Sequence, residues 1–323
     1  MDDSFYPRYK DGRLDPQVEA FLSSISKGES VPLRQQTPEE VRRNCSILGW
    51  VKVRGKADKV ADISIPGQAV DIPLRIYVPA GPGPFPVLLY LHGGGWVFGS
   101  LDEADHVCHH LAHGVPAVVV SVDYRLSPEH KYPCALEDAY AALLWVHAQI
   151  AAWNGDPKRI AVAGESAGAN MAAVLCAMAR DGNGPRISFQ LLICPWVDLL
   201  HYDTRAYGYF GDGPWLSKEN IGYYADQYLD RETQRMDPHV SPLLAADLAG
   251  LPPAHIITAE FDVLRDEGES YAGRLRAAGN TVTQKRYGGM IHSFIVLNKV
   301  LDVADEAMDD CVVVLKEGLA TPG

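Results

Sequence analysis

The chain has 323 residues, of which 47% are hydrophobic and 22% are charged, enough apolar material for one large domain or for a domain with a smaller cap. Its formal net charge of −12 makes nucleic acid and anionic membranes poor partners, because an acidic surface repels phosphate groups. We therefore expect no nucleic-acid partner and interpret the charge as a source of solubility.

Targeting and metal-binding signals are weak. The apolar runs are shorter than about 10 residues, whereas a membrane span needs roughly 20, so we expect no stable membrane insertion. The acidic, polar start at residues 1–4 predicts no secretory signal. The six cysteines are scattered without a C-x-x-C pair, which is typical of reduced core thiols in a cytoplasmic protein. We interpret His109-His110 as a solvated helix face, since adjacent helical residues point in different directions, and predict no metal and no cofactor.

The first fifty residues have helical patterns. Asp15 is a candidate N-cap and Pro16 a first helical residue, followed by apolar residues spaced along one helix face. These apolar residues are Val18, Phe21, Leu22 and Ile25. A capping box at Thr37-Pro38-Glu39-Glu40 predicts a second helix. The helices are too small to form a core alone, so residues 1–50 are predicted to be an N-terminal helical cap segment.

From about residue 58 the sequence patterns predict strands. Residues 60–65 and 72–78 alternate as half-buried strands, and Gly67 between them favours a hairpin. Continuous apolar runs then indicate strands buried on both faces, as in a parallel sheet. These runs are residues 87–91, 117–120, 160–163, 191–193 and 256–259. Helical stretches at 135–153 and 167–180 separate them, which predicts an α/β fold with a mostly parallel sheet and helices on both faces.

Residues 196–250 interrupt this alternation. The segment is rich in tyrosine, tryptophan, glycine and proline, and Ser217 is a candidate cap for a short helix. Because the aromatic side chains need an apolar surface to cover, we predict a cap or lid insertion above the strand ends. The alternative is a set of ordinary surface helices. The sheet domain is then formed by residues 51–195 and 251–323.

The sequence Gly164-Glu165-Ser166-Ala167-Gly168 matches G-x-S-x-G and lies between the predicted strand 159–163 and a predicted helix. A nucleophile elbow requires this context. Its tight turn exposes the serine hydroxyl at the N-terminus of the following helix, where the backbone N–H groups have no intrahelical partner. We predict Ser166 as the nucleophile. A glycine-rich turn arising by chance is the weaker alternative.

The run His92-Gly93-Gly94-Gly95-Trp96 follows another predicted strand. Three glycines leave backbone N–H groups open to a ligand, so the loop can donate to a developing oxyanion together with the N–H of Ala167. A phosphate-binding loop is disfavoured, because the run lacks the G-K-[ST] ending and the G-x-G-x-x-G spacing. We interpret His92 as a structural residue that holds the loop.

Several linked motifs resemble those of the hormone-sensitive-lipase-like esterases, within the α/β-hydrolases. They lie at residues 92–96, 123–130, 164–168, 260–268 and 291–294. The resemblance extends from about residue 60 to the end of the chain, and the N-terminal helices resemble that family's cap. It implies an α/β-hydrolase fold with a helical cap and a triad of Ser166, Asp262 and His292. It also implies an oxyanion hole of Gly93, Gly94 and Ala167, with Gly95 open as an alternative donor.

The residues around Asp262 and His292 agree with this assignment. Asp262 follows the predicted strand 254–259, at the strand end where such sheets place their sites. His292 follows the predicted strand 282–287 and the flexible pair Gly288-Gly289. For the acid, Glu260 and Asp266 remain open alternatives. Four positions depart from the family's usual residues: Glu165 stands for aspartate, Ala169 and Ser293 for glycine, and Val263 for proline.

These interpretations predict a serine carboxylesterase that hydrolyses short-to-medium acyl esters through an acyl-enzyme. Its expected partner is a small-molecule ester, and a homodimer stays open. An amidase or an acyltransferase could use the same triad, because the leaving group and acceptor depend on pocket shape. A non-catalytic ligand receptor on the same fold is expected to lack a triad residue, and all three candidates are present.

Overall fold

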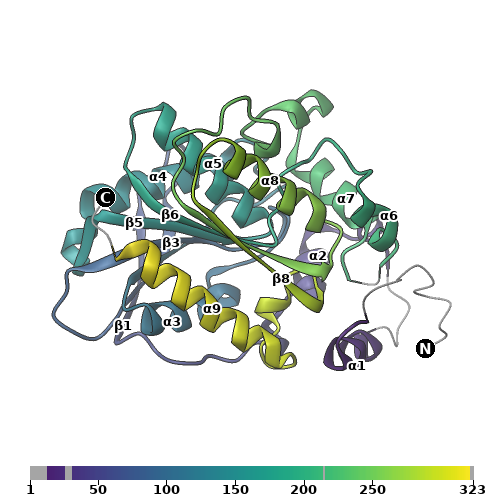
Figure 1. Cartoon of the computed structure of the whole chain (residues 1–323), viewed down its shortest axis with the longest axis horizontal. Coiled ribbons are helices and arrows are strands. Elements are labelled where there is room, and N and C mark those ends of the chain that lie inside the picture. Colours follow the sequence, from purple (N-terminus) through teal and green to yellow (C-terminus); the bar gives the residue numbers. More distant parts are fainter. Residues whose placement is uncertain (1–12, 26–30, 214, 321–323) are drawn as a thin grey trace.

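The computed structural model describes residues 13–25, 31–213 and 215–320 (Figure 1). In this part of the chain an eight-stranded sheet has the order β1-β2-β4-β3-β5-β6-β7-β8. The strands are β1 (Lys59–Ile65), β2 (Ile72–Val78), β3 (Phe85–Leu91), β4 (Val118–Val122), β5 (Gly155–Glu165), β6 (Ile187–Ile193), β7 (Ala254–Phe261) and β8 (Val282–Ile291). The predicted fold class, an α/β fold with a mostly parallel sheet, is confirmed.

Strand direction explains the two kinds of sequence pattern. Strands β1 and β2 form the predicted antiparallel hairpin, and β2 also runs antiparallel to β4. From β4 to β8 every neighbouring pair is parallel. A strand in the interior of a parallel sheet is covered by helices on both faces, so most of its positions are apolar. All five residues of β4 are buried, whereas β1 alternates toward solvent.

Helices cover both faces of the sheet (Figure 1). On one face lie α4 (Cys134–Gln149), α5 (Ala167–Asp181) and α8 (Arg265–Ala277), and on the other lie α3 (Leu101–Gly114) and α9 (Asp302–Leu319). Short 3₁₀ helices η4 (Ile150–Trp153) and η7 (Phe294–Val296) follow α4 and β8. None of the helices in the described ranges has the length and apolar character that crossing a bilayer requires.

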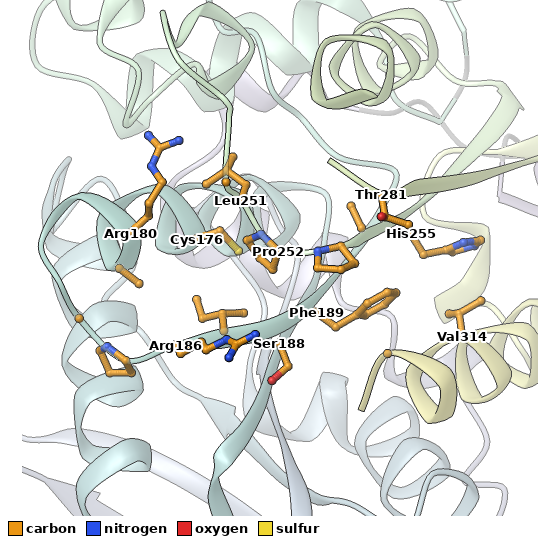
Figure 2. A pocket seen from close by; sticks show the side chains of 18 of the residues that line it. Cys176, Arg180, Arg186, Ser188, Phe189, Leu251, Pro252, His255, Thr281 and Val314 are labelled. Carbon is orange, nitrogen blue, oxygen red and sulfur yellow. The ribbon is translucent and has the colours of Figure 1, made fainter. Parts of the chain in front are cut away.

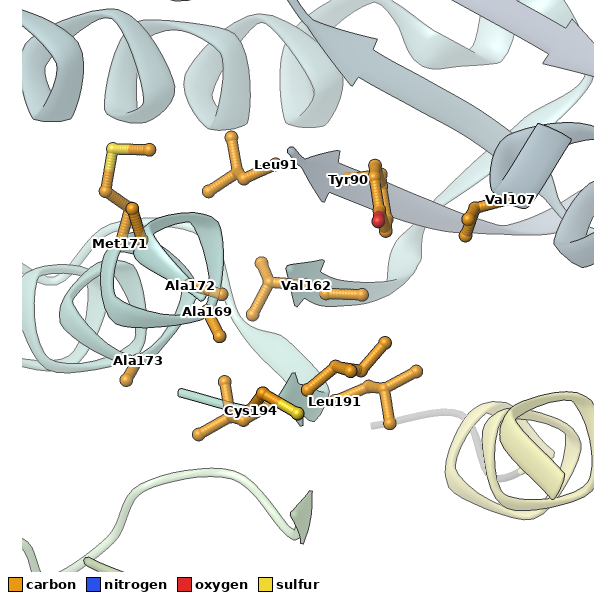
Figure 3. Close-up of a cluster of buried hydrophobic side chains, with 14 of the residues drawn as sticks. Tyr90, Leu91, Val107, Val162, Ala169, Met171, Ala172, Ala173, Leu191 and Cys194 are labelled. Atoms are coloured by element: carbon orange, nitrogen blue, oxygen red, sulfur yellow. The ribbon is translucent and has the colours of Figure 1, made fainter. Parts of the chain in front are cut away.

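The core beneath the elbow is built on small residues of α5. Figure 3 shows Ala169, Ala172 and Ala173 on this helix beside side chains of the central strands, such as Val162 and Leu191. Small side chains let the helix axis approach the sheet closely and still fill the space at the density of a protein interior. The close approach fixes where α5 begins, and therefore where the residue before it lies.

The N-terminal segment contains α1 (Pro16–Ile25), η2 (Leu33–Gln35), α2 (Pro38–Cys45) and η3 (Leu48–Trp50). As predicted, Asp15 caps α1, accepting from the Gln17 N–H at 2.8 Å, and Thr37 with Glu40 forms the capping box of α2. The Asp15 N–H donates to the carbonyl of Gly289 at 3.1 Å, which ties α1 to β8. The helix therefore packs on the sheet domain, as its short apolar face requires.

Residues 196–250 contain α6 (Arg205–Phe210), α7 (Lys218–Tyr228), η5 (Glu232–Met236) and η6 (Pro242–Leu244). Ser217 caps α7 as predicted, in a capping box with Asn220. Most of the aromatic side chains of this segment are buried or half-buried, although Tyr209 is 48% exposed. The η6 end of the segment packs against α5 and α8.

The interpretation of His109-His110 as a solvated helix face is wrong. His110 is 9% exposed and its Nε2 lies 3.0 Å from Asp309 of α9, while Nδ1 of His109 accepts from the Ala57 N–H at 3.1 Å. The reason is that α3 packs on the sheet beside α9. His110 therefore faces α9, while His109 is covered by Tyr77 of β2 and by the backbone of Ala57.

Replacing Phe21 tests whether α1 is an integral part of the fold. The ring is 4% exposed and makes edge contacts with Trp50 and Trp215 at centroid distances of 5.2 and 5.3 Å. Phe21→Ala should lower the free energy of unfolding by about 3 kcal/mol, the usual cost of deleting a buried aromatic ring. Urea unfolding measures this. Glu19→Ala, on the exposed side of the same helix, is the matched control and should stay within about 0.5 kcal/mol of wild type. Equal stability of both variants would mean that α1 is a dispensable appendage.

Candidate active site

Ser166 lies on a strained turn between β5 and α5. Its φ and ψ angles are 54° and −116°, a conformation that non-glycine residues rarely adopt. The turn closes because the neighbours are small: a Cβ on Gly164 would strike the backbone of Gly168, and one on Gly168 would strike the carbonyl of Leu91. The geometry is that of a nucleophile elbow, which presents the serine at the carboxyl edge of the sheet.

Three side chains that are far apart in sequence meet at this edge. Nε2 of His292 lies 2.9 Å from Oγ of Ser166, and Nδ1 of His292 lies 2.7 Å from Oδ2 of Asp262. The three side chains are buried, with Ser166 and His292 each 7% exposed and Asp262 1% exposed. Oδ1 of Asp262 also accepts from the Leu264 N–H at 2.9 Å, which fixes the carboxylate.

The structure separates the alternative acids from His292. Oε2 of Glu260 accepts from the Gly289 N–H at 2.8 Å, so this side chain supports the backbone before His292. The carboxylate of Asp266 accepts from the Ala206 N–H at 2.8 Å, in the cap insertion. Neither carboxylate is bonded to the imidazole in the structure.

The expectation of a flexible Gly288-Gly289 pair is wrong, since β8 continues through both glycines to Ile291. Gly289 has a φ of +72°, and the pairing of β7 with β8 changes register between Ala259 and Phe261. The two glycines lie in this irregularity, between the paired residues Tyr287 and Ile291. The N–H of Gly289 donates to Glu260 and the carbonyl of Gly289 accepts from the Asp15 N–H, and these two bonds hold Gly289 in place. His292 thus follows the strand directly.

The glycine run lies between β3 and α3, at the mouth of the site. Gly94 and Gly95 have φ angles of +110° and +58°, and a Cβ on either would collide with Phe98 or Tyr224. Gly93, Gly94 and Gly95 line the same pocket as Ser166. This conformation leaves the backbone close to the serine, and no larger residue could take the place of these glycines.

The contacts of His92 are with this loop and with Tyr124, as expected for a structural residue. Its ring stacks on Tyr124 at a centroid distance of 4.2 Å, and its Nδ1–H donates to the carbonyl of Gly93 at 2.7 Å. The Tyr124 hydroxyl donates to the carbonyl of His92 at 2.8 Å. Burial lowers the pKa of His92 to about 4, so the ring is neutral at neutral pH.

The environment of His292 favours its protonated form. Burial alone lowers the pKa of the imidazole, but the Asp262 carboxylate, through its charge and its hydrogen bond, and the charge of Glu165 outweigh burial and raise it. The Cys194 thiol lies near Asp262 and His292, with their ligand atoms within 4.8 Å of one another. Burial raises the pKa of this thiol well above its usual value, so it carries no charge at neutral pH.

A cavity of about 550 Å³ opens onto Ser166 and His292. Both the N-terminal segment and the insertion contribute to its walls, with Ile47, Trp50, Trp215, Leu216, Ile221 and Tyr224. Among the described residues that line it, three are glutamates and none is lysine or arginine. A larger cavity of about 800 Å³ lies at the amino ends of β6 and β7 and is lined by residues such as Cys176, Phe189 and His255 (Figure 2). That cavity contains none of the three triad candidates.

Two contacts at the site were missed by the sequence analysis. Nε1 of Trp215, in the insertion, donates to the carbonyl of His292 at 2.8 Å. The Ser293 hydroxyl donates to Oε1 of Glu165. Glu165 and Ser293 are two of the four departures from the family pattern. They lie far apart in the sequence, so the pattern gives no sign of the contact between them.

Comparisons with known proteins place this geometry in a family. The family described as the alpha/beta hydrolase fold matches residues 88–296. The chain is 47% identical over 244 residues to the carboxylic ester hydrolase LipN of Mycobacterium tuberculosis, a match that covers 74% of this chain and 65% of LipN. It is 43% identical to the carboxylesterase NlhH of the same species, covering 77% of this chain and 79% of NlhH.

Solved structures agree. A thermostable esterase from Pseudomonas putida superposes with a TM-score of 0.91 at 39% identity, covering 96% of this chain and 99% of that one. A hyperthermophilic esterase from Pyrobaculum calidifontis superposes with a TM-score of 0.88 at 37% identity, covering 94% and 98%. The fold is that of an α/β hydrolase. The chain belongs to the hormone-sensitive-lipase-like esterase family within it, as its sequence motifs predict.

Proposed function

We propose that the chain is a serine carboxylesterase in which Ser166, His292 and Asp262 form the catalytic triad. The observation that carries the proposal is the continuous hydrogen-bonded series from Oγ of Ser166 through the imidazole to Asp262, at 2.9 and 2.7 Å. The carboxylic ester hydrolase LipN and the carboxylesterase NlhH support the reaction class. The match spans 65% of the length of LipN.

In the proposed reaction, His292 accepts the proton of Ser166 at Nε2 while Oγ attacks the ester carbonyl. Asp262 holds the imidazole in the tautomer that leaves Nε2 free and stabilises the imidazolium. His292 then protonates the departing alcohol. Water repeats the sequence on the acyl-enzyme and releases the carboxylic acid.

The oxyanion would be held by backbone N–H groups of Gly93, Gly94 and Ala167. The positive φ of Gly94 and the position of Ala167 as the first residue of α5 support this assignment, since N–H groups in the first turn of a helix have no intrahelical partner. Gly95 stays the alternative donor within the loop.

We propose residues 1–50 and 196–250 as the cap over a sheet domain of residues 51–195 and 251–323. Residues 1–12, 26–30, 214 and 321–323 of these ranges lie outside the part of the chain that the structure describes. Support comes from the aromatic contacts of Phe21, Trp50 and Trp215, which join the two cap segments beside the pocket. The bulky walls favour short-to-medium acyl esters. An ethyl acetate hydrolase from Pseudomonas putida, 33% identical over 95% of this chain, is consistent with a short acyl group.

The other expected features are part of the same proposal. A cytoplasmic location is supported by six free cysteines, of which Cys108, Cys176, Cys194 and Cys311 are buried. The partner is a small ester, and a homodimer stays a prediction. An amidase or acyltransferase would use the same triad, and assays with matched amides and with added alcohol acceptors separate these reactions from hydrolysis.

Replacing the nucleophile tests the proposal. Ser166→Ala should lower kcat for p-nitrophenyl butyrate hydrolysis by roughly 10⁴-fold or more, because no nucleophile remains. Steady-state kinetics and circular dichroism measure activity and folding. Ser270→Ala, at an exposed position of α8, is the matched control and should keep wild-type kinetics. A folded Ser166→Ala enzyme with more than about a tenth of wild-type activity would contradict the assignment.

The triad acid has its own test. Asp262→Asn should lower kcat by roughly 10⁴-fold, because the imidazole loses the partner that fixes its tautomer. Glu260→Gln retains an acceptor for the Gly289 N–H and should cost far less. Kinetics of the two purified variants decide between them. A crippling Glu260→Gln with a mild Asp262→Asn would show that the acid is misassigned.

Acyl-chain preference tests the pocket. Trp50, Trp215 and Tyr224 bound the 550 Å³ cavity, so p-nitrophenyl butyrate should be hydrolysed with a higher kcat/KM than the palmitate ester. The measurement uses substrate below the critical micelle concentration across chains from acetate to palmitate. Faster turnover of palmitate would mean that the walls open onto a longer acyl channel.

A further inference from the structure

Glu165 is a buried carboxylate that the proposed acyl transfer does not use. It is the last residue of β5, directly before Ser166, and is 5% exposed. Its Oε1 accepts from the Ser293 hydroxyl and lies 3.9 Å from Nε2 of His292. Its Oε2 lies where a Cβ on Gly93 would be, so the carboxylate packs against the glycine loop. One side chain thus contacts the residue after the general base and the loop proposed for the oxyanion.

The charged and titratable groups around the imidazole and its two neighbouring carboxylates come from several elements. They are Glu165 of β5, Asp262 after β7, Cys194 after β6, Tyr90 of β3, Tyr124 after β4 and Glu267 of α8. Burial holds the pKa of Cys194, Tyr90 and Tyr124 well above their usual values, so these three are neutral at neutral pH. Oε1 of Glu267 accepts from the N–H groups of Val197 and Asp198. Asp262 and Glu165 therefore flank the imidazole itself.

We propose that Glu165 is a second carboxylate for His292, a positioning residue whose negative charge stabilises the imidazolium from the Nε2 side while Ser293 holds the carboxylate in place. The inference rests on the proposed function, because it assigns His292 as the general base. It goes beyond the triad, since Asp262 acts at Nδ1 and Glu165 acts at the nitrogen that exchanges the proton.

The physical argument is electrostatic. His292 becomes positively charged when it takes the proton of Ser166, and that proton arrives at Nε2, 3.9 Å from the carboxylate. In a buried site such a charge pair is screened far less than in water, so the carboxylate lowers the energy of the imidazolium and of the transition state that contains it. Burial, the largest cause, and the charge of Asp262 raise the pKa of Glu165 above its usual value. The positive charge of His292 and the hydrogen bond from Ser293 oppose this rise, so the carboxylate is favoured in its ionised form when the imidazolium is present.

The backbone of the His292 loop fits this role. Ser293 has a φ of +57°, a left-handed conformation that turns the chain after His292. Its hydroxyl is thereby brought to Glu165 across the sheet edge. The contact joins the strand that carries the nucleophile to the loop that carries the base, so Glu165 also limits movement of the ring.

The test is the pH dependence of kcat/KM between pH 5 and 9, measured with p-nitrophenyl butyrate. The acid limb reports the pKa of the group that must be neutral in the free enzyme. Glu165→Gln keeps an oxygen that can accept from Ser293 but removes the charge. Because that charge raises the pKa of His292, its loss should move the acid limb to lower pH by about one unit. The plateau kcat should fall roughly tenfold, since the same charge stabilises the transition state.

Ser293→Gly is the matched control. Glycine tolerates the φ of +57° and removes the hydroxymethyl side chain, so the loop keeps its path and Glu165 keeps its carboxylate group. The plateau kcat should fall, because the carboxylate is less firmly held, while the acid limb stays within about 0.3 units of wild type. If Glu165→Gln does not fold, Glu165→Asp carries the test: its charge is one methylene farther from Nε2, and its acid limb should shift downward by less.

Two results would overturn the proposal. A folded Glu165→Gln enzyme with lower kcat and an unchanged acid limb would show that Glu165 only fills space in the core. An unchanged kcat together with an unchanged acid limb of the pH profile would show that the carboxylate has no part in the reaction. Failure of the proposed function is distinguishable, because the wild-type enzyme in the same series would then show no ester hydrolysis at all.

Discussion

The site depends on two hydrogen bonds that link Ser166 to His292 and His292 to Asp262. The three residues follow β5, β8 and β7, whose ends lie at one edge of the sheet. Ser166 and His292 are 126 residues apart in the sequence, so no local element can bring them together. The parallel arrangement of β5, β6, β7 and β8 does so, because all four strands end at the same edge. A further shift in register at the bulged β7–β8 pairing would move His292 away from the serine. The hydrogen bond from the Gly289 N–H to Glu260 opposes such a shift.

Much of this arrangement could be predicted because it is encoded by local patterns. The apolar run of β4, the alternation of β1 and β2, and the small residues on both sides of Ser166 each reflect a physical requirement of one element. The same holds for the caps at Thr37 and Ser217. The acid was harder to assign, since Glu260, Asp262 and Asp266 fall within seven residues and only their directions in space distinguish them.

What could not be predicted depends on packing between distant segments. His110 is covered because α9, near the end of the chain, packs against α3, and His109 is covered by Tyr77 and Ala57. The bond from Trp215 to the His292 carbonyl joins the cap insertion to the site, and no spacing in the sequence indicates it. Glu165 and Ser293 are separate departures from the family pattern in the sequence, and the fold brings them into contact by placing the end of β5 beside the loop after β8. Such contacts join residues that are far apart in the sequence, so no local pattern predicts them.

The central claim is that His292 activates Ser166 as a nucleophile. Labelling with a fluorophosphonate tests it most directly, because the reagent reacts covalently with an activated serine and needs no knowledge of the natural substrate. Intact-protein mass spectrometry and peptide mapping should show one adduct per chain, located on Ser166, and its formation should slow as the pH falls and His292 becomes protonated. An adduct on another residue, or the absence of any adduct on the folded protein, would contradict the account.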